Sequence, residues 1–358
     1  MYLQSLQELQ NYVDNLSIQQ NEKLMIMVAE NSTEELNEMR DYLNSKNVPF
    51  FGGIFPGLLN GNSHESSGFI VQKLESVYSS LVLPYLMPLR ISPESLMNCT
   101  AIVFVDGLSS KIRDLTNTVF NKLGKNVRYI GGGAGFHNLE HKPCIFDNKG
   151  LYQDALYICV VRSRIELAVK HGWNKLEGPF RVDKSEGNIL SMLDDENAYD
   201  LYRYVIENVE GLRLFKEDFF LFAKDHPFGI LQEDTTVIVR DPISVNEEND
   251  IVLVADIPVG SEVYILKGDK DTLLSSSLQI AQECASKAPE KYRPLLFDCI
   301  SRAMFLEEQF EEELQNIQAK MKYPVEGVLS FGEIASKRNG ELVIHNKSTI
   351  LGILEENE

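Results

Sequence analysis

The amino-acid sequence predicts an α+β (mixed α/β) fold, in which repeated strand–helix–strand units with glycine turns form mixed and antiparallel sheets flanked by helices, in two halves. Two observations predict this class. One pattern occurs three times: a short apolar strand, a charged amphipathic helix, and a second strand that runs into glycines. Residues 219–267, in contrast, are short apolar runs separated by turn residues, which is typical of antiparallel strands. The combination is not a regular βαβ array.

Residues 1–23 are predicted to form a leading helix, because leucines and a valine recur at the spacing of one helical face. This segment lacks the basic and apolar regions of a signal peptide. No stretch of the chain is long and apolar enough to span a bilayer, so we expect no membrane insertion.

The net charge is −19, from 34 basic and 53 acidic residues. This balance argues against nucleic acid and anionic membrane surfaces as partners, since both attract clustered lysine and arginine. The five cysteines form no Cys-x-x-Cys pair and no cluster with metal-ligand spacing. Sparse, unpaired cysteines within apolar runs suit a reducing compartment, so we expect a cytoplasmic protein.

The first unit is predicted to have strands at residues 24–29 and 48–57, the second of which contains Gly52 and Gly53, and a closing strand at 69–74. The second unit is predicted to have a strand at 101–107, which includes Asp106, and a helix at 110–123. Its second strand, 127–135, contains Gly132 and Gly133, and residues 155–161 are expected to be a buried central strand.

The middle of the chain is less regular. Strands are predicted at 167–173 and 180–183, followed by a helix that begins at Glu196. The antiparallel segment is expected to contain four strands, at 219–223, 236–240, 251–255 and 261–266. A domain boundary is predicted between 213 and 214, which divides the chain after the leading helix into domains of residues 24–213 and 214–358.

A long helix at 271–286 is predicted to lead into the third unit, whose strands are at 295–299 and 325–334. The acidic stretch 307–313 between these strands is interpreted as the solvent face of a helix. It does not require a metal, because no second acidic or histidine cluster has a defined spacing to it.

The glycines at 131–135 follow a strand, as they do in a dinucleotide-binding loop. Residues 136–143 resemble a loop rather than a helix, so the helix dipole that would favour a pyrophosphate is missing. Two interpretations remain open: a tight turn where two backbones pack closely, and a loop whose N–H groups face a small anionic ligand. Three such turns could line one cleft.

His171 and Trp173 lie at a predicted strand end. One interpretation is packing, with Trp173 in the core and His171 bonded to the backbone. The other is a ligand pocket with an aromatic wall and one hydrogen-bonding group. An imidazole could also ligate haem iron, for which five other histidines are rivals.

Polar residues also follow the first strands of the second and third units. In an open sheet such residues point into the crevice where ligands bind. Arg302 could hold a carboxylate, and Glu333 could receive a ligand ammonium group. Cys299 could be a nucleophile, but an inert thiol is favoured because no histidine or aspartate is fixed beside it.

The order of these motifs resembles the FIST domain family. The phenylalanine–glycine motif at 51–53, the glycines at 131–135 and the His-Gly-Trp motif at 171–173, followed by Asn188 and a helix near 198–202, are similar to the N-terminal part of FIST domains. The segments 258–263, 297–302 and 331–334 resemble the C-terminal part. The similarity covers nearly the whole chain after residue 23.

FIST domains are regarded as sensory modules of signal transduction. The resemblance implies a non-enzymatic protein that binds an amino-acid-like metabolite in a cleft between its two halves, without a cofactor. The expected ligand-binding residues are Gly52, Gly53, Asp106, Gly132, Gly133, His171, Trp173, Cys299, Arg302 and Glu333.

Two alternatives stay open. Some family members are haem-containing nitric-oxide sensors that act with histidine kinases, and here His171 would be the candidate haem ligand. The other alternative is an enzyme with a Cys299 nucleophile or with phosphate-binding glycine turns. The chain has an apolar stretch at 51–57 where many relatives have a more polar one. It carries no fused kinase, methyl-accepting or F-box segment, so a histidine kinase or other separate partner would carry the signal.

Overall fold

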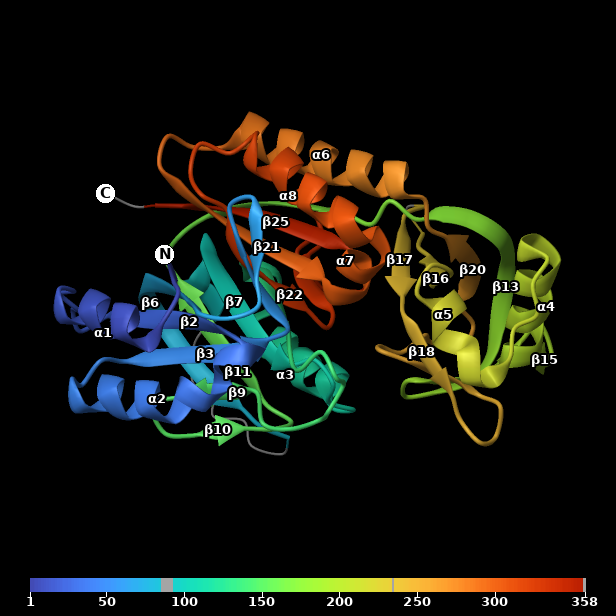
Figure 1. Ribbon diagram of the computed structural model, residues 1–358, viewed down its shortest axis with the longest axis horizontal. Coiled ribbons are helices and arrows are strands. Elements are labelled where there is room, and N and C mark those ends of the chain that lie inside the picture. Colours follow the sequence, from blue (N-terminus) through green and yellow to red (C-terminus); the bar gives the residue numbers. More distant parts are fainter. Residues whose placement is uncertain (85–92, 234, 357–358) are drawn as a thin grey trace.

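Two lobes make up the molecule, as the computed structural model of the chain shows for residues 1–84, 93–233 and 235–356 (Figure 1). The smaller lobe is built on an eight-stranded sheet that begins at β13 (Asn174–Glu186) and ends at β20 (Glu262–Lys267). It is inserted into the larger lobe between β12 (Ile165–Lys170) and α6 (Lys270–Lys287). The larger lobe therefore contains both ends of the described chain.

The three predicted units are present in the larger lobe, and they share one topology. In each unit the first two strands pair in parallel and the last strand pairs antiparallel to the first. The first unit comprises β2 (Glu22–Ala29), α2 (Leu36–Ser45), β3 (Phe50–Phe55) and β6 (Phe69–Val82). The second comprises β7 (Cys99–Asp106), α3 (Ile112–Leu123), β8 (Val127–Ala134) and β11 (Leu156–Val161). The third comprises β21 (Tyr292–Cys299), α7 (Ile300–Leu306), α8 (Phe310–Gln318), β22 (Glu326–Ser330) and β25 (Thr349–Glu355).

One glycine occupies the same position in all three units. In the parallel ladders Gly52 pairs with Ile26, Gly131 with Val103, and Gly327 with Leu296. A Cβ on any of these glycines would collide with the carbonyl oxygen of its paired residue. These glycines therefore lie inside strands and permit a close backbone approach. The prediction of turns at strand ends is wrong for the glycines at 52–53 and 131–133, because sequence alone does not reveal what a strand packs against. In the third unit Gly332, at φ 86°, does follow the end of β22.

Each unit also supplies a hairpin to a different unit. The hairpins are β4 (Gly57–Asn60) with β5 (Ser63–Glu65), β9 (Ile145–Asp147) with β10 (Leu151–Tyr152), and β23 (Glu333–Ser336) with β24 (Leu342–His345). The hairpin of the first unit pairs with the third unit at β22, that of the second with the first at β3, and that of the third with the second at β8. The three units therefore exchange hairpins in a closed ring.

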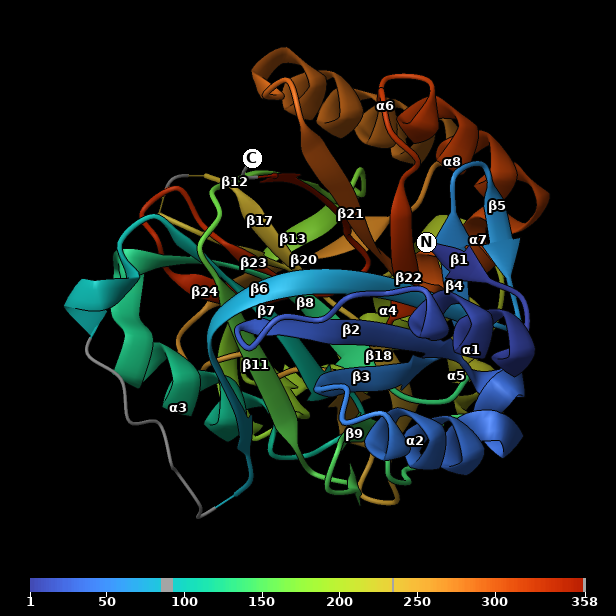
Figure 2. The same cartoon turned by 90° about the vertical axis from the view of Figure 1, so that its left-hand side faces the viewer.

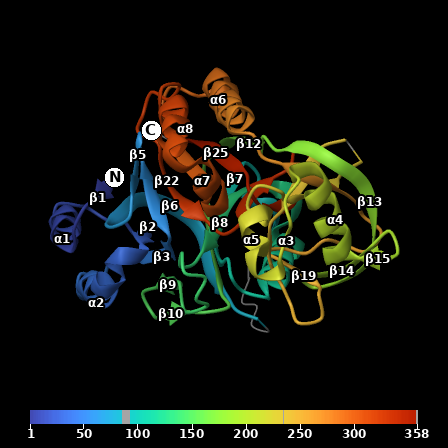
Figure 3. The same cartoon turned by 45° about the vertical axis from the view of Figure 1, so that its right-hand side comes forward.

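This exchange builds two sheets that share a core. The order is β10-β9-β3-β2-β6-β11-β7-β8-β23-β24 in the larger sheet, where β1 (Tyr2–Leu3) also pairs with β6, and β12-β25-β21-β22-β4-β5 in the other. In that core, the ring centroids of Phe104 from one sheet and Phe297 from the other lie 6.2 Å apart. Helices α1 (Leu6–Asp14) and α2 pack on the larger sheet (Figure 2), while α6 and α8 pack on the smaller one (Figure 3).

The smaller lobe has its own core, formed between its sheet and two helices. Asn197 caps α4 (Ala198–Glu210) by accepting hydrogen bonds from two backbone N–H groups, and Gly211, at φ 68°, ends it. The other elements are β14 (Ile189–Leu193), β15 (Glu196–Asn197), α5 (Phe219–Ala223), β16 (Phe228–Leu231), β17 (Val237–Arg240), β18 (Pro242–Val245) and β19 (Ile251–Leu253).

Three local predictions need correction or refinement. Residues 219–223 form helix α5 rather than a strand, since a short apolar run does not distinguish the two. The leading helix spans only Leu6–Asp14, because Ser5 caps it and Tyr2–Leu3 joins the larger sheet as β1. The predicted boundary at 213/214 lies inside the smaller lobe, so both predicted halves contribute to each lobe.

No helix within the described ranges has both the length and the apolar character that a membrane span requires.

Candidate ligand site at the junction of the two lobes

A cluster of charged side chains is buried where the third unit meets the smaller lobe. Its six members are at most 4% exposed: Arg302, Lys347, Asp298, Glu313, Glu333 and Asp241. Asp241 follows β17 of the smaller lobe, while the other five belong to the larger lobe. Charged groups at this depth are rare unless they are paired, so the cluster is a costly feature of the junction.

Two ion pairs account for four of these groups. Arg302 Nε lies 3.0 Å from Glu313 Oε1, and Lys347 Nζ lies 3.0 Å from Asp241 Oδ1. The sequence predicts that Glu313 lies on the solvent face of a helix, but its side chain is fully buried, because it lies on the side of α8 that faces Arg302. The sequence interpretation of residue 313 is therefore wrong.

The two remaining carboxyl groups are less closely paired: Asp298 Oδ1 lies 3.8 Å from Arg302 Nε, and Glu333 Oε1 accepts a hydrogen bond from Ser330 Oγ at 3.0 Å. Burial raises the pKa of Asp298 well above its usual value, and the neighbouring Glu313 adds to the shift. Burial and the nearby Asp298 likewise raise the pKa of Glu333 well above its usual value. Burial therefore disfavours a negative charge on both groups.

Some polar atoms of the cluster lack partners. Among the described residues, Asp298 Oδ2 and both amide atoms of Asn346 are buried without a hydrogen bond. Asn346 is 1% exposed and precedes Lys347 in the chain. Buried polar groups are nearly always hydrogen-bonded, so these atoms mark a place suited to a polar ligand group.

Arg302 already has protein partners on all three of its nitrogens. Nη1 donates to the His171 carbonyl at 2.5 Å, and Nη2 donates to the Leu273 carbonyl at 2.7 Å and to Ser276 Oγ at 3.2 Å. Together with the Glu313 pair, these bonds use most of its donors. The contacts favour a structural role for Arg302 over the predicted contact with a ligand carboxylate.

His171 and Trp173 lie beside this cluster. The Trp173 indole N–H donates to the Lys347 carbonyl at 2.8 Å, and His171 Nδ1 accepts from the Trp173 backbone N–H at 3.0 Å. Burial, with a further contribution from Arg302, lowers the pKa of His171 to about 4. His171 is therefore neutral at physiological pH, and both residues are fixed by packing and backbone contacts.

The structure thus brings together about half of the predicted site residues. His171, Trp173, Cys299, Arg302 and Glu333 are in or beside the cluster, and Gly132 pairs with Glu333 in the β8–β23 ladder. Gly133 packs against the Phe331 carbonyl and donates its N–H to the Gly332 carbonyl at 2.8 Å. β8 therefore has a strand on each side, which leaves little room for a phosphate on its glycines.

Gly52, Gly53 and Asp106 lie elsewhere. An added Cβ on Gly53 would meet the Phe55 ring, which is consistent with packing. Asp106, 1% exposed, has its Oδ2 atom 2.9 Å from His141 Nε2 and accepts the Asp154 N–H at 2.8 Å. Possible ligand atoms of Asp106, His141 and Asp154 lie within 4.8 Å of one another, close enough to share one cation. Sequence reasoning predicted no such group, because its members come from the end of β7 and from two separate loops.

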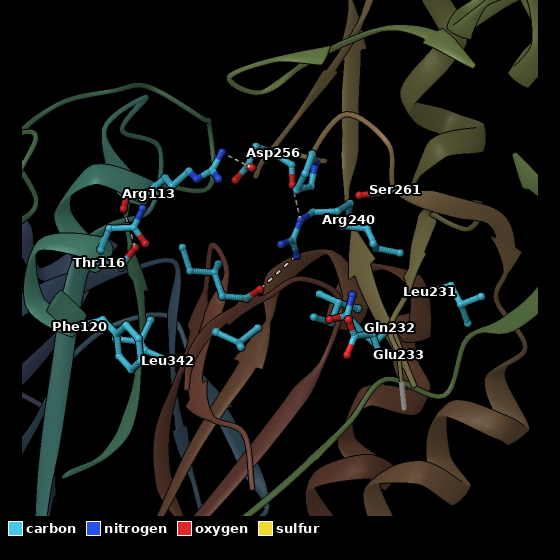
Figure 4. Close-up of a pocket in the computed structure, with 16 residues that line it drawn as sticks. Arg113, Thr116, Phe120, Leu231, Gln232, Glu233, Arg240, Asp256, Ser261 and Leu342 are labelled. Atoms are coloured by element: carbon cyan, nitrogen blue, oxygen red, sulfur yellow. Dashed lines mark hydrogen bonds and ion pairs between the residues drawn. The ribbon is translucent and has the colours of Figure 1, made fainter. Parts of the chain in front are cut away.

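An open pocket of about 400 Å³ separates the two lobes near this cluster (Figure 4). α3 and β24 of the larger lobe line it on one side, and β16, β17 and the segment 256–261 line it on the other. Arg113 of α3 pairs with Asp256 across it at 2.7 Å. None of the predicted site residues is in its lining.

Two chain segments connect the pocket to the cluster. Arg240 lines the pocket and the next residue, Asp241, belongs to the cluster; likewise Ile344 lines the pocket shortly before Asn346 and Lys347. The sequence did not identify Arg240 as a site residue, because it ends an apolar predicted strand and the residues after it are typical of a turn. An arginine inside such a strand is the signal that could have identified it.

Cys299 is expected to be unreactive in the folded protein. It is 3% exposed, and burial raises the pKa of its thiol well above the usual value. Brief treatment with iodoacetamide should therefore leave Cys299 unmodified, whereas the same protein in guanidinium chloride should label at all five cysteines, which are all buried in the native state. Peptide mass spectrometry measures this, and rapid labelling of native Cys299 would contradict the inert assignment.

The surroundings of His171 do not fit haem. Nδ1 is engaged by Trp173, the cationic Arg302 contacts the His171 carbonyl, and His171 is absent from the lining of the interlobe pocket. A tetrapyrrole would have to displace these neighbours to reach the imidazole. The arrangement favours a neutral core histidine.

Comparison with known proteins adds two findings. The FIST N domain matches residues 57–196, and the FIST C domain matches residues 198–336. The chain is also 27% identical over 276 residues to a protein of Methanocaldococcus jannaschii described as uncharacterized. That match covers 68% of this chain and 52% of the relative, so the chain spans about half the length of the relative.

Proposed function

The chain belongs to the FIST family, and from this premise we propose that it is a non-enzymatic sensory protein whose ligand binds between the two lobes. FIST domains are associated with sensory signal transduction. The observation that carries the proposal is the pocket of about 400 Å³ lined from both lobes. A small molecule held there touches both lobes, so its binding energy depends on their relative position.

The ligand is proposed to be an amino-acid-like metabolite. The pocket lining combines apolar side chains, among them Phe120 and Ile230, with arginine, acidic and amide groups. This mixture suits a small molecule with one apolar part and charged ends. The ligand state would be read by a separate protein, such as a histidine kinase, in the cytoplasm.

The enzyme alternative has little support from these contacts. Cys299 Sγ lies 3.2 Å from Ser301 Oγ and is buried, without the exposure that a nucleophile needs. The glycine strands offer no free cradle for a phosphate. A sensory role therefore fits the site better than group transfer.

A thermal-shift screen tests the proposal. Amino acids, nucleobases, organic acids and haem would be added separately to the purified protein, and a ligand at a hundred times its dissociation constant should add about 2.7 kcal/mol of stability. Haem binding would in addition give a Soret band, which we do not expect.

Two tryptophan variants locate the site. Asn117 and Asn121 are both exposed on α3, one turn apart, but only Asn117 lines the pocket. Asn117→Trp should abolish the ligand-induced shift, while Asn121→Trp should preserve it. If both variants respond like the unmodified protein, the ligand binds elsewhere; if no compound stabilises the protein, the proposal fails.

A further inference from the structure

Of the described arginines that line the interlobe pocket, only Arg240 is buried. It lies at the end of β17, and its residue surface is 8% exposed. Its Nε donates to the Asp256 carbonyl at 2.8 Å, and Nη1 donates to the carbonyls of Val239 at 3.0 Å and Ile344 at 3.1 Å. Figure 4 shows the guanidinium group in the space between the lobes. These three carbonyls hold the side chain in a fixed position.

The Asp256 carboxylate, which pairs with Arg113, acts on Arg240 only from beyond ion-pair distance, where it raises the Arg240 pKa against the larger effect of burial. In the described ranges, Arg240 makes no ion pair, and no hydrogen bond of Nη2 is found. Burial lowers its pKa to about 10, so the group remains a cation at neutral pH. Burying a charge costs free energy, and carbonyl dipoles offset this cost less well than an opposite charge does. An anionic partner would therefore stabilise the buried guanidinium.

The other charged residues of the pocket indicate which kind of anion Arg240 can bind. Arg113 and Asp256 neutralise each other at 2.7 Å, which leaves the buried Arg240 and the exposed Glu233. One buried cation matches a monoanion, and Glu233 would repel a dianion such as a phosphate monoester. A ligand that also carries an ammonium group could pair with Glu233.

The rest of the lining is suited to an apolar group. Phe120 and Leu342 of the larger lobe and Ile230 and Ile238 of the smaller lobe contribute to the pocket wall. The pocket therefore combines one fixed anion-binding group with apolar side chains from both lobes.

We propose that Arg240 binds the carboxylate of the ligand through its free Nη2 edge, and that the ligand is a small carboxylic acid with an apolar body. This rests on the proposed function and deepens it by naming the recognised group. It also assigns carboxylate recognition to Arg240 instead of Arg302, because all three nitrogens of Arg302 already have protein partners.

The first test uses the unmodified protein and needs no variant. Isothermal titration would compare leucine, phenylalanine, isovalerate and phenylacetate with the carboxamide of each compound. The expected result is that at least one acid binds and that its amide binds at least tenfold more weakly. If an amide binds as well as its acid, the inference is wrong while the proposed ligand site stands; if none of these compounds binds, the inference is wrong as well.

A matched pair of variants assigns the contact. Arg240→Gln should weaken binding of the acid at least tenfold and leave weak amide binding unchanged. The double variant Arg113→Gln/Asp256→Asn, which removes the neutral ion pair of the same pocket without changing its net charge, should change acid binding less than threefold. An equal loss in both variants would overturn the assignment to Arg240, and circular dichroism would confirm that both variants fold.

Discussion

Arg302→Met is expected to destabilise the protein by about 3–5 kcal/mol, the range found when one partner of a buried ion pair is removed. The guanidinium is fully buried and pairs with the equally buried Glu313 at 3.0 Å. Methionine fills much of the same volume but leaves Glu313 without its cation and removes the arginine donors to the His171 and Leu273 carbonyls. Chemical denaturation with guanidinium chloride measures the change.

A second arginine provides the control for this variant. Arg181 pairs with Asp183 in the smaller lobe, but its side chain is 59% exposed. Arg181→Met should change stability little, because water already screens an exposed pair. Adding Glu313→Gln to Arg302→Met should recover part of the loss, since it removes the uncompensated charge. A loss in Arg302→Met as small as in Arg181→Met would show that the buried pair is not essential.

Gly131→Ala is expected to cost about 3 kcal/mol or more, at or above the upper end of the range for overpacked cores. A Cβ on Gly131 would collide with the Val103 carbonyl oxygen, a backbone atom that cannot move away like a side chain. β7 and β8 would have to separate in the centre of the larger sheet, where both strands have neighbours on each side. Reduced soluble expression and a lower melting temperature are the observable effects.

Gly187→Ala is the matched control for this substitution. Gly187 has a positive φ of 57° between β13 and β14, and nothing lies within 4 Å of an added Cβ. The control should lose only about 1 kcal/mol, from backbone strain alone. If Gly131→Ala proves as mild as Gly187→Ala, the parallel strands are not packed as closely as the structure indicates.

The repeated unit could be predicted from the sequence, but the way in which its strands pair could not. The glycines at 52, 131 and 327 mark the same strand in each unit, so the pattern revealed three related units with mixed sheets. Strand pairing decides what faces each glycine, and pairing depends on segments far apart in the chain. The packing role of these glycines was therefore open until the ladders were known.

The candidate site was predictable only in part for the same reason. His171, Trp173, Cys299, Arg302 and Glu333 stood out as polar or aromatic residues near strand ends, and they do gather at one junction. Glu313 and Arg240 did not stand out. The helical pattern around 313 suited a solvent face equally well, and nothing local indicates that the strand ending at Arg240 borders a pocket.

The ring of exchanged hairpins has a consequence for how the chain folds as it is synthesised. β4 is synthesised long before its partner β22, and β8 long before its partner β23. Until these partner strands leave the ribosome, β4 and β8 have open edges that can pair with other molecules. Contacts so distant in sequence favour slow folding, so truncated chains should be prone to aggregate.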